Sequence, residues 1–322
     1  MKAIVQDTYG STDVLEFTDI DTPEVGDDDV LIRVHAAGVD PGVWHLMTGL
    51  PYLVRLGFGF RAPKTRVPGM DVAGHVEAVG KNVTQVQTGD DVFGTCDGSF
   101  AEYACAKENR IAPKPANLTF EQAAAVPVSA CTALHGLRDS GEVQAGQRVL
   151  IIGASGGVGT FAVQLARAFG AEVTGVCSTT NVDMVRSIGA NQVIDYTRDD
   201  FAQMGQRYDV ILDTAGNRSL PHLRRALTPR GTLVIVGGEG GDRWIGGTDR
   251  QLRALVLSPF VRHNLRSFVS TERTEDLQCL KELIEAGKVT PVIDRTYPLS
   301  DVPEAIRYLE QGHARGKVVI SV

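Results

Sequence analysis

Four glycines and a serine lie where an apolar run ends and a helical pattern begins, and their backbone groups could hold a phosphate. Residues 149–152 are Val-Leu-Ile-Ile, and residues 153–159 read Gly-Ala-Ser-Gly-Gly-Val-Gly. A strand that breaks into glycines and then a helix leaves unpaired N–H groups at the helix start, where the helix dipole favours negative charge. Gly156 and Gly159 stand where a dinucleotide fingerprint needs close backbone approach and close helix packing, with Ala154 at the place of its first glycine. We therefore expect a pyrophosphate-binding turn.

A second strand over residues 172–177 follows at the spacing of a βαβ unit. Enzymes that use NAD usually carry an Asp or Glu at its end, which accepts hydrogen bonds from the ribose hydroxyls. This chain has Ser178, Thr179 and Thr180 there. No carboxylate in this stretch repels a 2′-phosphate, and three hydroxyls can donate to it. The pattern favours NADPH.

Two further residues and one alternative bear on this cofactor prediction. Arg186 is the nearest cation after the strand, and Tyr196 could pack against the same phosphate. The alternative for residues 178–181 is an ordinary helix N-cap. A cap and a phosphate site are compatible.

The composition excludes several classes of protein. The chain has 322 residues, of which 43% are hydrophobic and 22% charged, and its net charge is −7. This charge gives no electrostatic footprint for nucleic acid or an anionic membrane. Five cysteines without CxxC spacing favour a reducing, cytoplasmic setting. The chain begins as a strand rather than a signal peptide, and no run of about 18 apolar residues exists, so we expect a soluble protein that is not integral to a membrane.

The chain changes character near residue 118. The first 117 residues read as short strands separated by Gly, Pro and Asp turns, which is typical of all-β structure. Thr119 and Gln122 then form a capping-box pattern that begins a helical segment. From residue 148 strands and helices alternate, which predicts a doubly wound parallel sheet. Its further strands are expected at residues 192–196, 208–213, 231–236 and 265–269, followed by a helix at 274–286 and two strands, 291–294 and 316–322, that rejoin the N-terminal β domain.

The chain resembles the medium-chain dehydrogenase/reductase superfamily from end to end, and within it the zinc-free quinone oxidoreductase and zeta-crystallin branch. The residues that carry the resemblance are 37–40, 68–74, 89–94, 98–103, 154–159, 193–196 and 316–319. The resemblance implies an α/β protein with two domains. A GroES-like β-barrel substrate domain (1–118 and 290–322) would be split around a Rossmann NADPH-binding domain (119–289).

The positions that hold catalytic zinc in related alcohol dehydrogenases look to be Asp40, Met70 and about Val128 in this chain. An acid, a thioether and an alkyl group make no tetrahedral zinc site. The cysteine-rich lobe for structural zinc is also missing around residues 95–98. His45 and His75 are better explained as hydrogen-bonding groups than as replacement ligands. We expect no metal.

Without a Lewis acid, alcohol oxidation loses its main electrostatic help, whereas a quinone or an α,β-unsaturated carbonyl is already electrophilic. The expected function is NADPH-dependent, metal-free reduction of such small hydrophobic acceptors. A related alternative is an alkenal or enoyl-thioester reductase. An alternative of another class is an NADPH-binding structural or regulatory protein with little turnover.

Two catalytic candidates are Tyr52 and Asp40. Tyr52 lies near an active-site Tyr of quinone oxidoreductases, but those relatives have an Asn-x-x-Asp-x-x-x-Arg-x-Gly pattern where this chain has Asp40, Val43 and Met47. A structural Tyr under a loop is the alternative for Tyr52, and a turn residue before Pro41 is the alternative for Asp40. The apolar residues 50–60, with 252–260, could wall a substrate site or form an interface or core. Arg243, Arg250, Arg253, Arg262 and Arg266 are most simply a solvated helical face, and the alternative is that one of them reaches the cofactor.

The resemblance also implies a set of cofactor contacts and an assembly. Thr132 would face the nicotinamide, Ala215 and Gly216 would pass near a ribose, and Lys317 would lie at the cofactor site. The remaining contacts are Ser155, Gly156, Gly157 and Val158 at the pyrophosphate, Ser178, Thr179 and Tyr196 at the adenosine phosphate, and Gly237 and Gly238 near the nicotinamide. A homodimer is expected through the last strand of the sheet, around Phe268; a monomer in light scattering would count against it.

Overall fold

A computed structural model of the chain describes residues 1–237 and 243–322. The chain divides into two compact units. The first contains Met1–Cys131, Thr271–Gly287 and Pro291–Val322, and the second contains Thr132–Ser270 and Lys288–Thr290. Compared with the expected domain boundaries, residues 119–131 and 271–287 group with the first unit.

The strands of the first unit, among the described residues, form a mainly antiparallel sheet in the order β14-β15-β3-β4-β5-β7, with β6 paired to β3. A separate hairpin joins β1 and β2. The closing strand β15 pairs with β3, with Val319 opposite Gly38, so the end of the chain does rejoin the N-terminal β domain. The bounds are β1 Lys2–Val5, β2 Glu16–Asp19, β3 Asp29–Val39, β4 Asp71–Val79, β5 Asp91–Thr95, β6 Tyr103–Lys107, β7 Ile111–Pro113, β14 Ile293–Pro298 and β15 Lys317–Ser321.

Helices punctuate this sheet where the sequence supplies caps. The capping box of Thr119 and Gln122 is confirmed at the start of α3. Within the region expected to be all strands, Pro41 begins α1, because its fixed φ suits the first helical turn, and Gly49 ends it at φ +62°. The helices are α1 Pro41–Thr48, α2 Arg55–Phe58, α3 Phe120–Ala124, α9 Thr274–Glu285 and α10 Val302–Glu310; α4, Pro127–Leu134, runs from this unit into the second.

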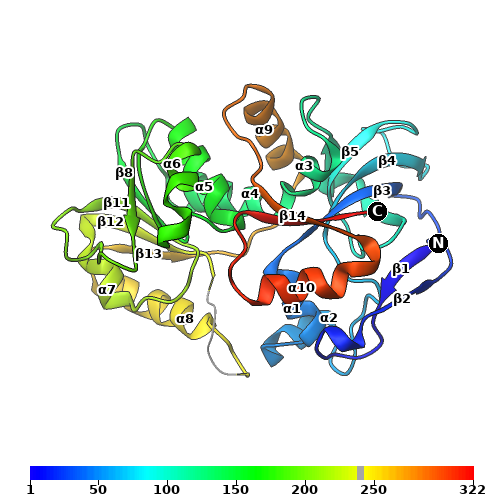
Figure 1. Cartoon of the computed structure of the whole chain (residues 1–322), viewed down its shortest axis with the longest axis horizontal. Helices are drawn as coiled ribbons and strands as arrows, with labels where there is room; N and C mark the ends of the chain where they lie inside the picture. The colour runs from blue at the N-terminus through cyan, green and yellow to red at the C-terminus, as the bar shows by residue number, and fades with distance from the viewer. Residues whose placement is uncertain (238–242) are drawn as a thin grey trace. The chain divides into compact units, whose positions relative to one another are not determined.

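The second unit is built, in its described part, on a parallel sheet in the order β10-β9-β8-β11-β12-β13. The predicted doubly wound sheet is confirmed, although its last strand ends at Ser267, one residue before Phe268. Helices α5 and α6 lie on one side of the sheet and α7 and α8 on the other (Figure 1). The bounds are β8 Arg148–Ile152, α5 Gly157–Ala168, β9 Glu172–Cys177, α6 Val182–Ser187, β10 Gln192–Asp195, β11 Tyr208–Asp213, α7 Leu220–Arg225, β12 Leu227–Ile235, α8 Thr248–Leu257 and β13 Asn264–Ser267.

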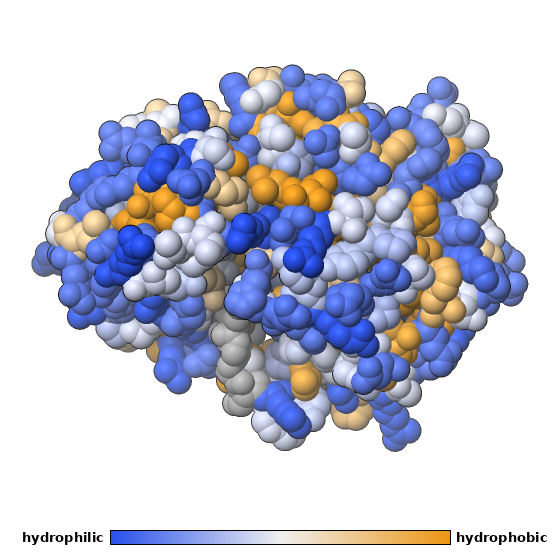
Figure 2. Space-filling model, in the orientation of Figure 1, coloured by the Kyte–Doolittle hydropathy of each residue, from blue (hydrophilic) through white to orange (hydrophobic). Residues whose placement is uncertain are grey.

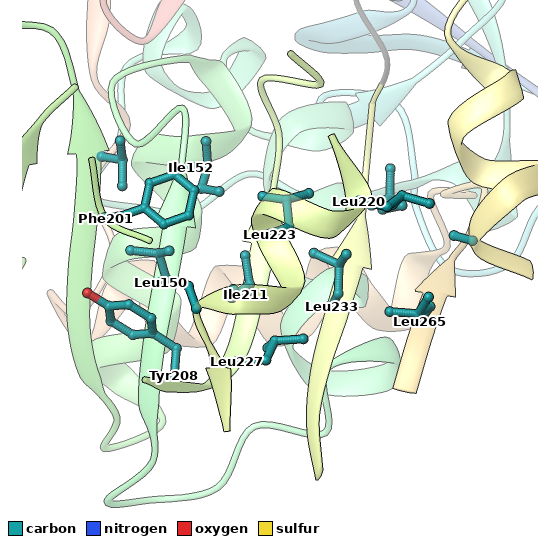
Figure 3. Close-up of a cluster of buried hydrophobic side chains, with 14 of the residues drawn as sticks. Leu150, Ile152, Phe201, Tyr208, Ile211, Leu220, Leu223, Leu227, Leu233 and Leu265 are labelled. Carbon is teal, nitrogen blue, oxygen red and sulfur yellow. The ribbon is translucent and has the colours of Figure 1, made fainter. Parts of the chain in front are cut away.

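One hydrophobic core fixes α7 and α8 against this sheet. Leu150, Ile211 and Leu233 come from three neighbouring strands and pack with Leu223 of α7 (Figure 3). All four side chains are completely buried. Burial of each such side chain stabilises the fold by about 1.5–3 kcal/mol, so the carboxyl edge of the sheet has a rigid base.

The face of the molecule in Figure 2 is mostly hydrophilic, with separate hydrophobic areas. Among the described residues, no helix has the length and apolar character required to cross a bilayer.

Candidate active site

The turn after β8 has the backbone geometry that a phosphate needs. Gly153 has φ +82°, in the region that favours glycine. A Cβ on Gly159 would lie 2.0 Å from the carbonyl oxygen of Gly153, so only glycine lets α5 approach the turn this closely. Gly156 is the N-cap of α5 and has no side chain with which to cap the first N–H groups. The turn therefore fits a pyrophosphate at the start of a twelve-residue helix.

Asn181 joins this turn to the end of β9. Its Nδ2 donates to Ser155 Oγ at 3.1 Å and to Ser178 Oγ at 3.2 Å. The structure thus brings two of the expected phosphate contacts, Ser155 and Ser178, onto one buried amide. The sequence suggested Asn181 only as part of a cap, because 25 residues separate it from the turn.

Thr179 is bound to a carboxylate that the sequence argument missed. Its Oγ1 donates to Asp195 Oδ2 at 2.5 Å, and this hydrogen bond lowers the pKa of Asp195. Asp195 ends β10, which lies beside β9, so the carboxylate reaches the end of β9 from the neighbouring strand. Arg198 follows, with Nε 3.5 Å from Asp195 Oδ2. Tyr196 is half-exposed beside them.

The turn after β11 lies against the turn after β8. Thr214 donates to the carbonyl oxygen of Ile152 from both its N–H, at 3.1 Å, and its Oγ1, at 2.8 Å. Gly216, at φ +71°, donates its N–H to Asp213 Oδ1 at 3.1 Å. Ala215 lies in this turn, and a Cβ on Gly237 would lie 3.6 Å from the oxygen of Thr214. The predicted contact Gly238 lies outside the described residues.

Four polar side chains meet inside the first unit. Lys317 Nζ donates to Asp40 Oδ1 at 2.5 Å, to Asp71 Oδ2 at 3.1 Å and to Ser129 Oγ at 3.2 Å. Ser129 Oγ donates to Asp40 at 2.9 Å. The lysine is 2% exposed, so the ammonium of this expected cofactor contact is held by the protein's own carboxyl groups. We call these four residues the Lys317 cluster.

The charges of the Lys317 cluster balance when one carboxyl group keeps its proton. Burial raises the pKa of Asp71 well above its ordinary value, and the charge of Asp40 raises it further. Burial acts in the same direction on Asp40, but the Lys317 ammonium and the hydrogen bonds from Asp71, Lys317 and Ser129 together outweigh it and lower the pKa of Asp40. The two carboxyl groups in turn overcome the effect of burial on Lys317 and raise its pKa. Of the two carboxyl groups, Asp71 is therefore the one that holds a proton more readily, and the cluster carries no net charge while Asp71 is protonated.

Tyr52 begins a short 3₁₀ segment, Tyr52–Val54, and its ring lies on the guanidinium of Arg55, with 4.8 Å from Cζ to the ring centroid. Tyr9 covers the same guanidinium at 4.5 Å. Thr132 is half-buried in α4. Of the five arginines expected on a solvated helical face, Arg250 is not solvated, because it forms a buried ion pair with Asp213.

These features indicate a dinucleotide-dependent oxidoreductase, and the similarity of the chain to known proteins supports this class. The "Alcohol dehydrogenase GroES-like domain" family matches residues 26–116, and the "Zinc-binding dehydrogenase" family matches residues 188–320. The 2-methylene-furan-3-one reductase of Solanum lycopersicum is 37% identical over 99% of this chain and 79% of its own length. The chloroplastic NADPH-dependent alkenal/one oxidoreductase of Arabidopsis thaliana is 36% identical over the same shares. The solved quinone oxidoreductase of Coxiella burnetii superposes with a TM-score of 0.86 at 30% identity, covering 100% of this chain and 99% of that one.

The chain belongs to the medium-chain dehydrogenase/reductase superfamily, in its quinone oxidoreductase branch, and is an NAD(P)H-dependent oxidoreductase. In the part of the chain that the structure describes, no three His, Cys, Asp or Glu side chains are grouped so that they could hold a metal ion.

The raised pKa of Asp71 leads to a prediction about how the stability of the protein depends on pH. Because its folded pKa is raised, its contribution to stability is complete below the unfolded value of about 3.9 and is lost as pH rises through the folded pKa. The unfolding free energy of the wild type should therefore fall by about 1.4 kcal/mol per pH unit relative to Asp71→Asn within that window. Denaturant unfolding measured in steps from about pH 4 upward follows this difference, and parallel curves would contradict it.

Lys317→Met, as a contrast, should cost about 3–5 kcal/mol at pH 7 because it leaves a buried carboxylate unpaired. Denaturant unfolding at pH 7 measures this cost.

Proposed function

We propose that the protein catalyses metal-free, NADPH-dependent reduction of quinones or α,β-unsaturated carbonyls. The observation that carries the proposal is the Lys317 ammonium bound to Asp40 at 2.5 Å. Asp40 stands where related alcohol dehydrogenases have a zinc ligand. A carboxylate whose charge is neutralised by an ammonium and which also accepts a hydrogen bond from Ser129 is a poor ligand for a metal ion. The chemistry must then use an acceptor that is electrophilic without a Lewis acid.

The preference for NADPH is supported by the groups at the ends of β9 and β10. Ser178 and Thr180 present hydroxyls that can donate to a 2′-phosphate, Arg198 adds a guanidinium, and Tyr196 offers a half-exposed ring. Asp195 opposes this preference, but Thr179, Thr197 and Arg198 already hold its oxygens. The Arabidopsis relative carries NADPH in its name.

Bound NADPH would supply a hydride to the electrophilic carbon of the acceptor. The residues of this chain would hold and orient the reactants. The N–H groups of Gly157 and Val158 would bind the pyrophosphate, while Thr132, Ala215, Gly216 and the neighbouring Gly237 would contact the nicotinamide half. Tyr52 would donate a hydrogen bond to the acceptor oxygen, where negative charge develops as the carbon–carbon double bond is consumed. A proton then adds to the neighbouring carbon, or to oxygen in a quinone. Asp40 would not contact the acceptor, because its carboxylate is buried. It would act indirectly, through its contacts in the Lys317 cluster.

Two alternatives remain distinct from this proposal. An alkenal or enoyl-thioester reductase would share the chemistry and differ in pocket shape, and the names of the tomato and Arabidopsis relatives favour small enones over thioesters. An NADPH-binding structural or regulatory protein would bind the cofactor with little turnover. The apolar residues at Val43 and Met47, where relatives have polar ones, keep this second alternative in view.

Two expectations about the setting are also proposals. A homodimer is supported by β13, which is the edge strand of its sheet and is followed by the exposed Val269. A cytoplasmic location is supported by the five cysteines, which form no disulfide among the described residues.

The experiment that tests the proposed function is steady-state oxidation of NADPH with benzoquinone, a 2-alkenal and an enoyl thioester in parallel. We expect turnover with the quinone or the alkenal, a higher kcat/KM with NADPH than with NADH, and no loss of activity after dialysis against a chelator. A metal assay on the same sample is the control. Tight NADPH binding without turnover on any acceptor would overturn the enzyme proposal, and chelator-sensitive activity would overturn its metal-free form.

Replacement of Tyr52 by Phe tests the proposed hydrogen-bond donor. The ring that stacks on Arg55 is retained, so kcat should fall about tenfold or more while KM changes little. Tyr9→Phe is the matched control, since it keeps the other ring on the same guanidinium. Unchanged kcat in Tyr52→Phe would remove this residue from the mechanism.

Replacement of Arg198 by Gln tests the phosphate site. Loss of one partly exposed charged contact should weaken NADPH binding about five- to tenfold and leave NADH binding within about twofold. Arg66→Gln, an exposed arginine of the first unit paired with Asp7, is the control. An equal effect on both nucleotides, or none on NADPH, would contradict the assignment.

A further inference from the structure

A buried arginine fixes the turn after β11 at both of its ends. Asp213, the last residue of β11, is completely buried. Its Oδ1 accepts the N–H of Gly216 at 3.1 Å, and its Oδ2 accepts Arg250 Nη2 at 2.5 Å. The same guanidinium donates from Nη1 to the carbonyl oxygen of Arg218 at 3.0 Å. One side chain thus holds the residue before the turn and the residue that closes it.

Arg250 comes from a different part of the chain and is itself held in place. It lies in the first turn of α8, and its side chain is only 12% exposed. Burial of this ion pair in good geometry makes its partners dependent on each other, because a lone buried carboxylate would be strongly unfavourable. Arg253, one turn further along the same helix, is 76% exposed and pairs with Asp249. The two arginines therefore have different roles on one helix.

The turn after β11 lies at the part of the sheet where a ligand is expected to bind. The strand order reverses between β8 and β11, since β9 and β10 lie on one side of β8 and β12 and β13 lie beyond β11. Ligands of such sheets bind at this point, beyond the carboxyl ends of the strands. The expected pyrophosphate contacts follow β8, and the expected adenosine contacts lie at the ends of β9 and β10. The other half of a dinucleotide must extend over β11 and β12, where residues 214–218 and Gly237 stand.

We propose that Arg250 is a positioning residue for the cofactor: through Asp213 and Arg218 it holds the turn at 214–218 in the form that receives the nicotinamide half of the dinucleotide. This role rests on the proposed function, because it assumes that the dinucleotide is the ligand. It does not require Arg250 to touch the cofactor. The loss of the arginine would loosen the turn and leave the adenosine contacts in place.

The first test measures nucleotide binding by Arg250→Met, Arg250→Lys and the control Arg253→Met. In Arg250→Met, a turn that holds its binding form about a tenth of the time would weaken NADPH binding about tenfold. Binding of 2′,5′-ADP, which has only the adenosine half, should stay within about twofold by the same argument. Arg250→Lys can pair with Asp213 but cannot also reach Arg218 with a fork of donors, so its NADPH affinity should fall between those of wild type and Arg250→Met. Arg253→Met should match the wild type.

The second test does not depend on any ligand. Amide hydrogen exchange in the peptide that contains Gly216 should accelerate in ligand-free Arg250→Lys and remain at the wild-type rate in Arg253→Met. If Arg250→Met does not fold, Arg250→Lys decides both measurements.

The outcomes separate this inference from the proposed function. A wild-type protein that binds neither NADPH nor NADH would overturn the proposed function and this role with it. Wild-type NADPH binding together with an Arg250→Lys variant that matches it in affinity and exchange would overturn the role alone. Equal weakening of NADPH and 2′,5′-ADP would also overturn it, because a general loss of structure moves both.

Discussion

The first unit depends on one buried ammonium between two carboxyl groups. Lys317 comes from β15, Asp40 from the start of α1, Asp71 from the start of β4 and Ser129 from α4, so the cluster joins four separate segments. A completely buried lysine is tolerable only when its charge is balanced and its donors are used. The backbone is adapted to this contact. A Cβ on Gly38 would lie 2.6 Å from Asp71 Oδ2, so the strand beside the cluster must be free of a side chain at that residue.

The same interaction limits the chemistry. The fixed positive charge of Lys317 is held by the protein's own carboxylate, so it differs from a metal ion with an open coordination position. Under the proposed function, an acceptor that already draws electrons, such as an enone or a quinone, would suit a site of this kind better than an alcohol. Stabilisation of the developing oxyanion would then depend on neutral donors, and the proposed one is the hydroxyl of Tyr52, whose ring stacks on Arg55.

In the second unit the carboxyl edge of the sheet is held together by polar contacts between neighbouring turns. Asn181 links the glycine turn to the end of β9, Thr179 links the ends of β9 and β10, and Arg250 links α8 to the turn after β11. Each contact joins two segments that end or lie at the carboxyl edge of the sheet. The hydrophobic core beneath, with Leu150, Ile211 and Leu233, keeps these strand ends in register.

Local patterns in the sequence were enough to predict the parallel sheet of the second unit, a glycine turn after its first strand, and the family. Glycine spacing and hydrophobic periodicity act within one βαβ unit, so they can be recognised without the rest of the fold. The prediction that Asp40 and Met70 stand where related alcohol dehydrogenases bind zinc came from the family resemblance. Helix α1 lay outside the expectation because Pro41 reads as a turn as readily as a helix start.

The partners of the charged and polar groups are set by the three-dimensional fold. It placed Asp195 beside Thr179, Arg250 on Asp213 and Lys317 between two aspartates, pairs separated by 16, 37 and at least 246 residues. No local pattern encodes such partners, because the energy of a buried charge depends on which groups the whole fold brings within hydrogen-bond distance.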